Sequence, residues 1–318
     1  MQLYFAPMEG ITDSVYRRLH HRHFGGPDRY YMPFISPTMH RCLTPKENRE
    51  LPMADSETFS AIPQILTKNA EDFLWAARQC MDRGYSEVNL NLGCPSGTVV
   101  AKGKGSGMLS NPDALDRFLD TVCSQSPVPV SVKTRLGIQD PQEFLGLLDI
   151  FNQYPISELI IHPRVRKAFY KPPVHQEMFR YATEHTHLPL CYNGDICSRT
   201  DLEALTTAFP NIRSVMVGRA FIANPGLFSS NGSDPGKLMA FHDDLVDSYT
   251  QCFGHPKNAV TRMKDNWHYL QGSFEGGEKL FKQLRKTTDP AQYRDITRQI
   301  FQTLPFRPEP EPVWIHNS

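Results

Sequence analysis

Apolar segments rich in β-branched and aromatic residues recur eight times over residues 3–220, and each is followed by a stretch with helical periodicity. The predicted strands span residues 3–8, 30–36, 61–66, 87–93, 129–137, 158–164, 188–195 and 214–220. Strands that alternate with helices are typical of parallel sheets. Eight such units in one chain favour an α/β fold of the (β/α)8 TIM-barrel type over a doubly wound sheet.

The remaining segments suggest a second domain. A polar insertion at 37–60 separates the second and third predicted strands, and we expect it to form a loop on the active face. From residue 236 the β pattern ends, and the sequence becomes helical with scattered Lys and Arg. We therefore predict a barrel domain over 1–235, a small all-helical domain over 236–308 and a proline-rich tail over 309–318.

Composition narrows the functional class. Apolar residues make up 40% and charged residues 21% of the 318 positions, which argues against disorder. The formal net charge of zero argues against a protein that coats nucleic acid, although a local basic patch remains open. The 7 cysteines include no C-x-x-C pair, and no apolar run reaches transmembrane length. We expect a cytoplasmic, monomeric enzyme without a metal site or membrane contact.

Polar residues gather near the carboxyl ends of the predicted strands. In a barrel these ends converge on one mouth, where catalytic groups lie, so the pattern predicts an active site. The residues are Gln64, Cys94, Lys133, Arg135, His162, Arg164, Asn193 and Asp195.

Cys94 directly follows a predicted strand that alternates between apolar residues and the amides Asn89 and Asn91. It lies between Gly93 and Pro95 at an accessible edge, which is typical of a reactive thiol rather than a core cysteine. The glycine-rich segment that follows, "SGTVVAKGKGSGML", predicts a mobile lid that carries Cys94 over the mouth. As a nucleophile Cys94 needs a histidine base, whereas as a proton donor it needs only to be within reach.

Lys133 shares the inward face of its strand with Arg135. A buried lysine is destabilising unless it is paired or functional. It could form a Schiff base, or it could oppose the electron-rich edge of a cofactor such as a reduced flavin. His162 could bond the same ring or serve the structure alone.

The last two strands are followed by "YNGDI" and "VGRAF". Barrels commonly bind phosphate between these loops, with backbone N–H groups at a short helix N-terminus. Gly194 and Gly218 allow close approach of the backbone, and Arg219 adds a charged fork for phosphate oxygens. Together the two motifs predict a phosphate site.

Several motifs, taken in order, resemble those of the tRNA-dihydrouridine synthases: "APMEGITD", "NLGCPSGTVVAKGKGSGML", "VKTRLG", "NGDI" and "VGRAFIANPGLF". The resemblance spans nearly the whole chain. It implies an FMN enzyme that uses NADPH or NADH to reduce uridine in tRNA, expected in the D-loop, to dihydrouridine. Hydride from flavin N5 would reach C6, and Cys94 as general acid would protonate C5.

The resemblance also assigns the binding residues. Those implied for FMN are Pro7, Met8, Glu9, Gln64, Lys133, His162, Asn193, Gly194, Asp195, Gly218 and Arg219. Those implied for the substrate are Asn91, Arg135 and Arg164. In the segment "HPRVRKAFYKPP", Arg164 and Tyr170 match the family, but Pro163 stands where glycine is common and removes a backbone N–H.

A uridine of folded tRNA must be splayed out to enter such a pocket, which requires a second RNA-holding surface. The candidate is the helical segment 236–308, with Arg262, Lys264, Lys282, Arg285 and Lys286. The main alternative is a flavin-dependent reductase or dehydrogenase of a free pyrimidine or dihydroorotate, which has no need of this segment. A Schiff-base aldolase and a non-catalytic RNA-binding module are further alternatives.

Overall fold

The computed structural model describes residues 1–171, 173–230 and 232–313. The chain divides into two compact units. The first unit comprises Met1–Pro7, Asp28–Asp195 and Thr206–Met216, and the second comprises Met8–Pro27, Ile196–Leu205 and Val217–Ser318. Each unit gathers segments that are far apart in the sequence, and the division predicted at 235 and 308 stays a prediction.

The first unit is built on a nine-stranded sheet whose strands run parallel. Its strands are β1 (Gln2–Phe5), β2 (Arg29–Tyr31), β3 (Ala61–Ile62), β4 (Gln64–Ile65), β5 (Val88–Leu92), β6 (Val130–Arg135), β7 (Leu159–His162), β8 (Leu190–Asn193) and β9 (Ser214–Val217). Their order is β3-β2-β1-β9-β8-β7-β6-β5-β4.

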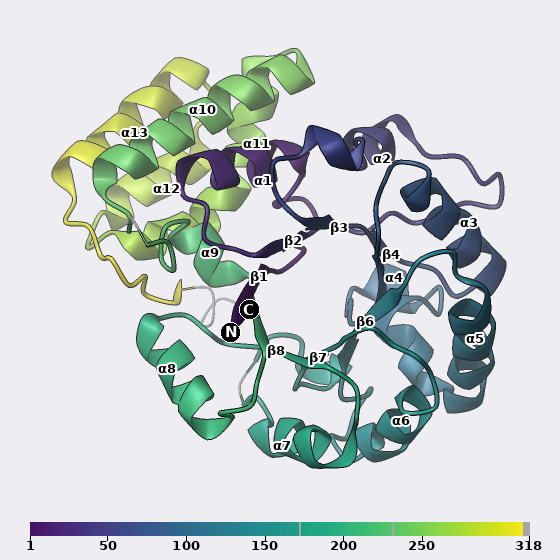
Figure 1. Cartoon of the computed structure of the whole chain (residues 1–318). Coiled ribbons are helices and arrows are strands. Elements are labelled where there is room, and N and C mark those ends of the chain that lie inside the picture. The colour runs from purple at the N-terminus through teal and green to yellow at the C-terminus, as the bar shows by residue number, and fades with distance from the viewer. Residues whose placement is uncertain (172, 231, 314–318) are drawn as a thin grey trace. The chain divides into compact units, whose positions relative to one another are not determined.

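The two ends of this order are one segment of chain, because only Pro63 separates β3 from β4. Proline has no N–H for the ladder, but the Pro63 carbonyl accepts from Asn89 N at 2.8 Å. The sheet therefore closes into a ring, as Figure 1 shows. This closure confirms the predicted (β/α)8 barrel, with the third predicted strand present as two short ones.

Several predicted strands are too long at their carboxyl ends. The segment predicted over 30–36 is a strand only over Arg29–Tyr31, because Pro33 interrupts the ladder. Pairing resumes only as a single bridge between Ile35 and Ile65. The mouth is thus lined by irregular backbone rather than by regular strand.

The helices of the first unit are α2 (Pro45–Glu50), α3 (Ala70–Met81), α4 (Gly97–Val100), α5 (Pro112–Gln125), α6 (Glu143–Phe151) and α7 (Gln176–His185), with 3₁₀ turns at Ala54–Ser56, Gly105–Ser110 and Arg166–Ala168. Helices α2, α3, α5, α6 and α7 lie outside the strand ring (Figure 1). The sequence predicts that α5 begins at Pro112 with Asn111 as its N-cap, and this cap is confirmed, since Asn111 Oδ1 accepts from Ala114 N at 3.1 Å.

The insertion at 37–60 is not only a loop, contrary to the prediction. Thr44 and Glu47 form a capping box in which Thr44 Oγ1 accepts from Glu47 N, while Glu47 Oε2 accepts from Thr44 N. This box starts α2. The signal T-x-x-E was present in the sequence, and a helix of six residues is too short to show apolar periodicity.

A buried carboxylate fills the barrel toward the amino-terminal ends of its strands. Glu158 accepts from the hydroxyls of Tyr4, Tyr31 and Ser214 at 3.2, 3.5 and 2.6 Å. Burial raises the pKa of Glu158. The apolar cluster above this carboxylate includes Ile160. The polar side chains of the predicted site lie at the opposite, carboxyl end of the strands.

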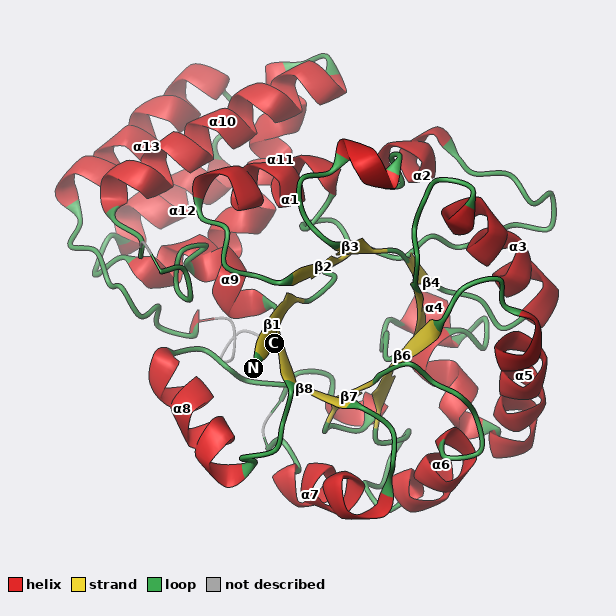
Figure 2. Ribbon diagram, in the orientation of Figure 1, coloured by secondary structure: helices red, strands yellow, loops and turns green. Residues whose placement is uncertain are grey.

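The second unit is helical (Figure 2). It contains α1 (Ser14–His23), α9 (Arg219–Ala223), α10 (Pro235–Phe253), α11 (Pro256–Leu270), α12 (Glu278–Lys286) and α13 (Pro290–Thr303), with a 3₁₀ turn at Gln271–Ser273. Helix α8 (Arg199–Ala208) begins in this unit and ends in the first. Among the residues that the structure describes, no helix is long and apolar enough to cross a membrane.

A buried hydrogen-bond chain links α10, α11 and α13. The Tyr293 hydroxyl accepts from Trp267 Nε1 at 2.9 Å and lies 2.8 Å from His242 Nε2. His242 Nδ1 lies 3.0 Å from the Asp243 carboxylate, which can only accept, so the proton of the neutral ring is on Nδ1 and Nε2 accepts from the Tyr293 hydroxyl. Burial lowers the pKa of His242, in keeping with a neutral ring.

Tyr293→Phe removes the shared hydroxyl and leaves the Trp267 and His242 nitrogens buried without this partner. We expect the free energy of unfolding to fall by about 2 kcal/mol. Urea denaturation followed by tryptophan fluorescence measures the change. Tyr181→Phe is the matched control, because the Tyr181 hydroxyl has no hydrogen bond within the described ranges. Equal stability of the two variants would contradict the assignment.

Candidate active site at the carboxyl end of the barrel

Most of the predicted site residues lie in the first unit, at or just after the carboxyl ends of their strands. The ladder pairs Asn91 with Lys133 and Arg135 with His162. Cys94, Arg164 and Gly194 follow their strands within two residues. Met8, Glu9, Gly218 and Arg219 belong to the second unit.

Buried amides from β4 and β5 form a continuous network. Gln64 Nε2 donates to Asn89 Oδ1 at 2.8 Å, and Asn91 Nδ2 donates to Gln64 Oε1 at 2.7 Å. Asn89 Nδ2 in turn donates to Ser131 Oγ at 3.0 Å. The sequence named Gln64 and Asn91 but not Asn89 and Ser131 as site residues, although the predicted alternation places Asn89 and Asn91 on the same face of β5.

Cys94 is held at a defined turn. Asn91 Oδ1 accepts from Gly93 N at 3.1 Å and from Cys94 N at 2.9 Å. The Cys94 carbonyl accepts from the amide and the hydroxyl of Ser106. The Cys94 residue itself is half-buried. The backbone is therefore fixed on both sides of a partly accessible thiol.

Lys133 is a half-buried cation on the inner face of β6. Within residues 1–171, 173–230 and 232–313, its ammonium forms no hydrogen bond and no ion pair. Burial, followed by the charge of Arg135, lowers its pKa to about 8. This ammonium is available to an electron-rich ligand at the mouth of the barrel.

Arg135 is only 1% exposed, and it ties together two loops. Its Nε donates to the Gly93 carbonyl at 2.9 Å, next to Cys94. Its Nη1 donates to the Phe169 carbonyl at 2.6 Å and the Val165 carbonyl at 3.3 Å. Burial lowers its pKa to about 10. The substrate role expected for Arg135 stays a prediction, and these contacts make it a support for the Cys94 turn.

The segment after β7 presents two exposed aromatic residues. Phe169 and Tyr170 are 45% and 40% exposed, and Phe169 has φ 49°, a strained value for a residue with a side chain. The Tyr170 ring lies 6.2 Å from His162 and beneath the Arg135 guanidinium at 5.3 Å. Phe169 was missed by sequence reasoning, because neither its exposure nor its strain shows in a pattern.

Arg164 and Asp195 form a paired unit. The fully buried guanidinium donates to both Asp195 oxygens, at 3.0 and 2.5 Å. Its Nη1 also lies 3.2 Å from His162 Nε2. Because Arg164 can only donate, Nε2 accepts and the His162 proton is on Nδ1. Arg164 was expected to contact the substrate and Asp195 to contact phosphate. Both roles stay predictions, and the structure shows these two side chains bound to each other.

Asn193 and Gly194 continue from β8. Asn193 Nδ2 donates to the Met216 carbonyl at 2.8 Å, which links β8 to β9. A Cβ at Gly194 would lie 3.3 Å from Val174 and 3.4 Å from the His162 ring, and the residue has φ 158°. A side chain at this position would therefore crowd both neighbours.

In the second unit, a tight turn holds Met8 and Glu9. The amides of Ile11 and Thr12 both donate to the Met8 carbonyl at 3.0 Å. Arg262 Nη1 donates to the carbonyl of Gly10, whose φ is 79°. Arg262 was expected on the RNA-holding surface, but its guanidinium is engaged with this turn.

Gly218 caps α9, and Arg219 is its first residue. A short helix therefore begins directly after the last strand of the barrel sheet, as the predicted phosphate site requires. Of the remaining cations of the helical segment, Lys282, Arg285 and Lys286 are exposed on α12, whereas Lys264 is half-buried.

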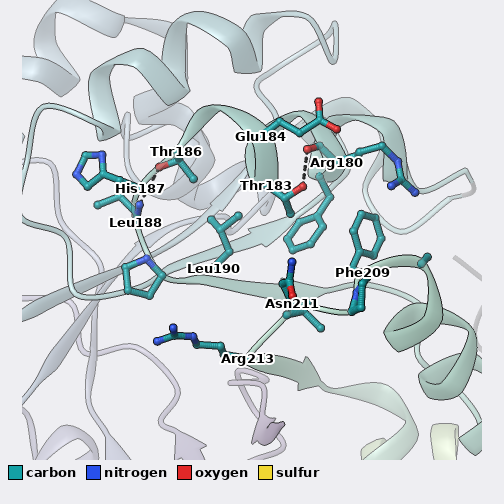
Figure 3. Close-up of a pocket in the computed structure, with 15 residues that line it drawn as sticks. Arg180, Thr183, Glu184, Thr186, His187, Leu188, Leu190, Phe209, Asn211 and Arg213 are labelled. Carbon is teal, nitrogen blue, oxygen red and sulfur yellow. Dashed lines mark hydrogen bonds between the residues drawn. The ribbon is translucent and has the colours of Figure 1, made fainter.

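A cavity of about 490 Å³ lies elsewhere in the first unit (Figure 3). Its lining includes Arg180 and Thr183 of α7, Leu190 at the start of β8, and Arg213 just before β9. It is therefore at the amino-terminal ends of the strands, away from Cys94. Among the described residues, no group of three or more His, Cys, Asp or Glu side chains could hold a metal ion.

Sequence comparisons with known proteins place this chain in one family, and a structural comparison agrees with its fold. The sequence profile of the dihydrouridine synthases matches residues 4–307. The tRNA-dihydrouridine(16) synthase of Neisseria meningitidis serogroup B is 28% identical over 313 residues, 93% of either chain. That of Cupriavidus necator is 29% identical over 315 residues, 93% of this chain and 96% of the relative. Among solved structures, morphinone reductase is similar in fold, with a TM-score of 0.51 at 11% identity over 71% of this chain and 84% of that chain.

Lys133→Met is expected to stabilise the ligand-free protein at pH 7 by about 2–3 kcal/mol. The folded-state pKa near 8 lies below the ordinary value of 10.5, so folding disfavours the charged form. The parent protein bears this penalty below pH 8 and is relieved of it as pH rises to 10.5. Urea denaturation at several pH values should show the advantage of the variant shrinking over that window.

The exposed Lys167 provides the control, because Lys167→Met changes charge without changing burial. A Lys133→Met protein no more stable at pH 7 than the parent would contradict the unpaired state of this ammonium.

Proposed function

Because the chain belongs to the dihydrouridine synthase family, we propose that it binds FMN and reduces the C5=C6 bond of a uridine in tRNA with NADPH or NADH as reductant. The observation that carries the proposal is the half-buried Cys94, whose backbone turn is held by Asn91 at the Cys94 amide and by Arg135 at the Gly93 carbonyl. On the strand paired to β5 lies Lys133, whose ammonium has no hydrogen bond or ion pair among the described residues. The two relatives described above are named for position 16, so this uridine is the first to map.

The residues present fit a flavin with a phosphate tail. Lys133 offers a cation without a protein acceptor among the described residues. A side chain at Gly194 would crowd Val174 and His162, and Gly218 with Arg219 opens a short helix. The residues proposed to hold FMN are Pro7, Met8, Glu9, Gln64, Lys133, His162, Asn193, Gly194, Asp195, Gly218 and Arg219. When bound and reduced, FMN supplies the hydride that uracil C6 receives.

Cys94 completes the reduction. Uracil C5=C6 is conjugated to C4=O, so gain of hydride at C6 leaves a pair of electrons that needs a proton at C5. The neutral Cys94 thiol donates this proton, and the resulting thiolate recovers one from solvent. Arg135 keeps Gly93 and the Phe169 loop in place, and Asn91, Arg135 and Arg164 are proposed to approach the uracil.

The partner is a folded RNA, and a second surface must hold it while one base enters the site. We propose α12 for this surface. Phe281 and Leu284 are buried on one side of the helix, and Lys282, Arg285 and Lys286 are exposed on the other. Contacts of this kind go to phosphate groups and weaken as salt is raised.

The function is tested by a single turnover without oxygen. Flavin bound to the protein is reduced, unmodified tRNA is added, flavin reoxidation is followed by absorbance, and dihydrouridine is mapped in the RNA. Reoxidation with product at one position supports the proposal. A reduced flavin that ignores tRNA but reacts with a free pyrimidine or orotate would move the protein to the alternative class.

Cys94→Ala should retain flavin but lower the rate of dihydrouridine formation by about a hundredfold or more, because the general acid is lost. The measurement is the same single turnover, with product counted in the RNA. Cys252→Ala is the control, since Cys252 is an exposed cysteine of the helical unit. Undiminished product in the Cys94 variant would remove this residue from the acid role.

Arg219→Ala should weaken FMN retention by about tenfold, the effect of losing one charge-assisted contact to phosphate. Flavin released during gel filtration and the dissociation constant of added FMN measure it. Arg298→Ala, at an exposed position of α13, controls for the lost charge. Equal flavin occupancy in the two variants would refute the phosphate assignment.

A further inference from the structure

The segment that follows β5 forms a closed loop, in which its last residue bonds its first. This segment, residues 94–106, is called the Cys94 loop. The amide and hydroxyl of Ser106 donate to the Cys94 carbonyl at 3.2 and 2.8 Å. Gly105 has φ 58°, and a Cβ there would lie 3.1 Å from Cys94 Cβ. Any movement of residues 105–106 is therefore transmitted directly to the residue that carries the thiol.

Lys104 immediately precedes this point of closure. Its Nζ donates to Ser36 Oγ at 2.9 Å, across 68 positions of sequence. Ser36 Oγ uses its own hydrogen to bond the Leu66 carbonyl at 3.1 Å, which leaves its lone pairs for the ammonium. Partial burial lowers the pKa of Lys104, so this ammonium has left part of its water shell for the contact.

The acceptor is itself fixed by the insertion at 37–60. The Ser36 amide donates to Glu47 Oε1 at 2.9 Å, and Glu47 Oε2 accepts from the amide and hydroxyl of Thr44 at 2.8 Å. Ile35, the residue before Ser36, pairs with Ile65 at the edge of the barrel. Ser36 is thus a rigid point, held from both the insertion and the sheet.

We propose that Lys104 is a positioning residue for Cys94: by donating to Ser36, it latches the returning end of the Cys94 loop onto the base of the 37–60 insertion. The latch keeps the thiol at the carboxyl end of the barrel, and the insertion contributes by fixing Ser36 through Glu47. The effect on catalysis rests on the proposed function, whereas the effect on the accessibility of Cys94 does not.

The loop contains its own control. Lys102 lies two residues away and is exposed, and its ammonium has no hydrogen bond within the described part of the chain. Lys104→Met and Lys102→Met remove the same charge from the same loop, but only the first removes the latch. Ser36→Ala removes the acceptor and leaves both lysines in place.

The experiment measures two rates on each flavin-bound variant. The first is the alkylation of Cys94 by iodoacetamide, read by mass spectrometry of the peptide that contains it. The second is reoxidation of reduced flavin by tRNA in a single turnover. For Lys104→Met and Ser36→Ala we expect alkylation about tenfold faster and reoxidation about tenfold slower than in the parent, since one charge-assisted hydrogen bond is lost. Lys102→Met should change neither rate by more than about twofold.

The latch is overturned if Lys104→Met and Ser36→Ala alkylate Cys94 no faster than Lys102→Met does. Two independent variants keep the test open should one of them fold poorly. If tRNA fails to reoxidise the flavin of the parent protein, the proposed function falls, but the alkylation rates still decide whether Lys104 holds the loop.

Discussion

Closure of the parallel sheet at residues 61–65 is the constraint on which the first unit depends. Only one residue, Pro63, separates the strand that pairs with β2 from the strand that pairs with β5. Pro63 has no N–H to donate to the ladder, but its carbonyl still accepts a hydrogen bond from the Asn89 amide. Because the ring is closed and every strand points the same way, all carboxyl ends share one rim. Side chains from β4 to β8 are thereby gathered without any need for proximity in sequence.

Burying cations at that rim costs free energy, and the three cations there differ in how far hydrogen bonds and ion pairs offset this cost. Arg135 directs its donors at three backbone carbonyls, and Arg164 neutralises Asp195 with two parallel hydrogen bonds. Lys133 has neither kind of partner among the described residues. A desolvated ammonium without an acceptor opposes folding. Of the three, Lys133 is therefore the one whose presence is best explained by a ligand, whereas the two arginines also hold loops.

Local patterns predicted local structure well. Eight alternating segments were enough for the barrel, and Asn111 before Pro112 marked the start of α5, because these signals depend on neighbours within one turn or one strand. Strand ends were less predictable, since Pro33 stops the ladder in a way that apolar content does not show. The capping box of α2 was visible as Thr44 and Glu47, but a helix this short has no periodic face to support it.

The sequence could not predict which distant acceptors the side-chain hydrogen-bond donors would contact. Cys94 was identified as accessible from its turn, yet Arg135, Ser106 and Lys104 restrain that turn through contacts that only the fold creates. Arg262 looked equivalent to the cations of α12 in sequence. It is separated by 252 positions from the Gly10 carbonyl that it bonds. The cations of α12 follow from periodicity, because Phe281 and Leu284 define the buried face and leave the charged residues on the other. The exposure of a cation can therefore be predicted from sequence when the periodicity of its own helix determines it. Where a distant carbonyl accepts its hydrogen bonds, as for Arg262, only the structure shows this.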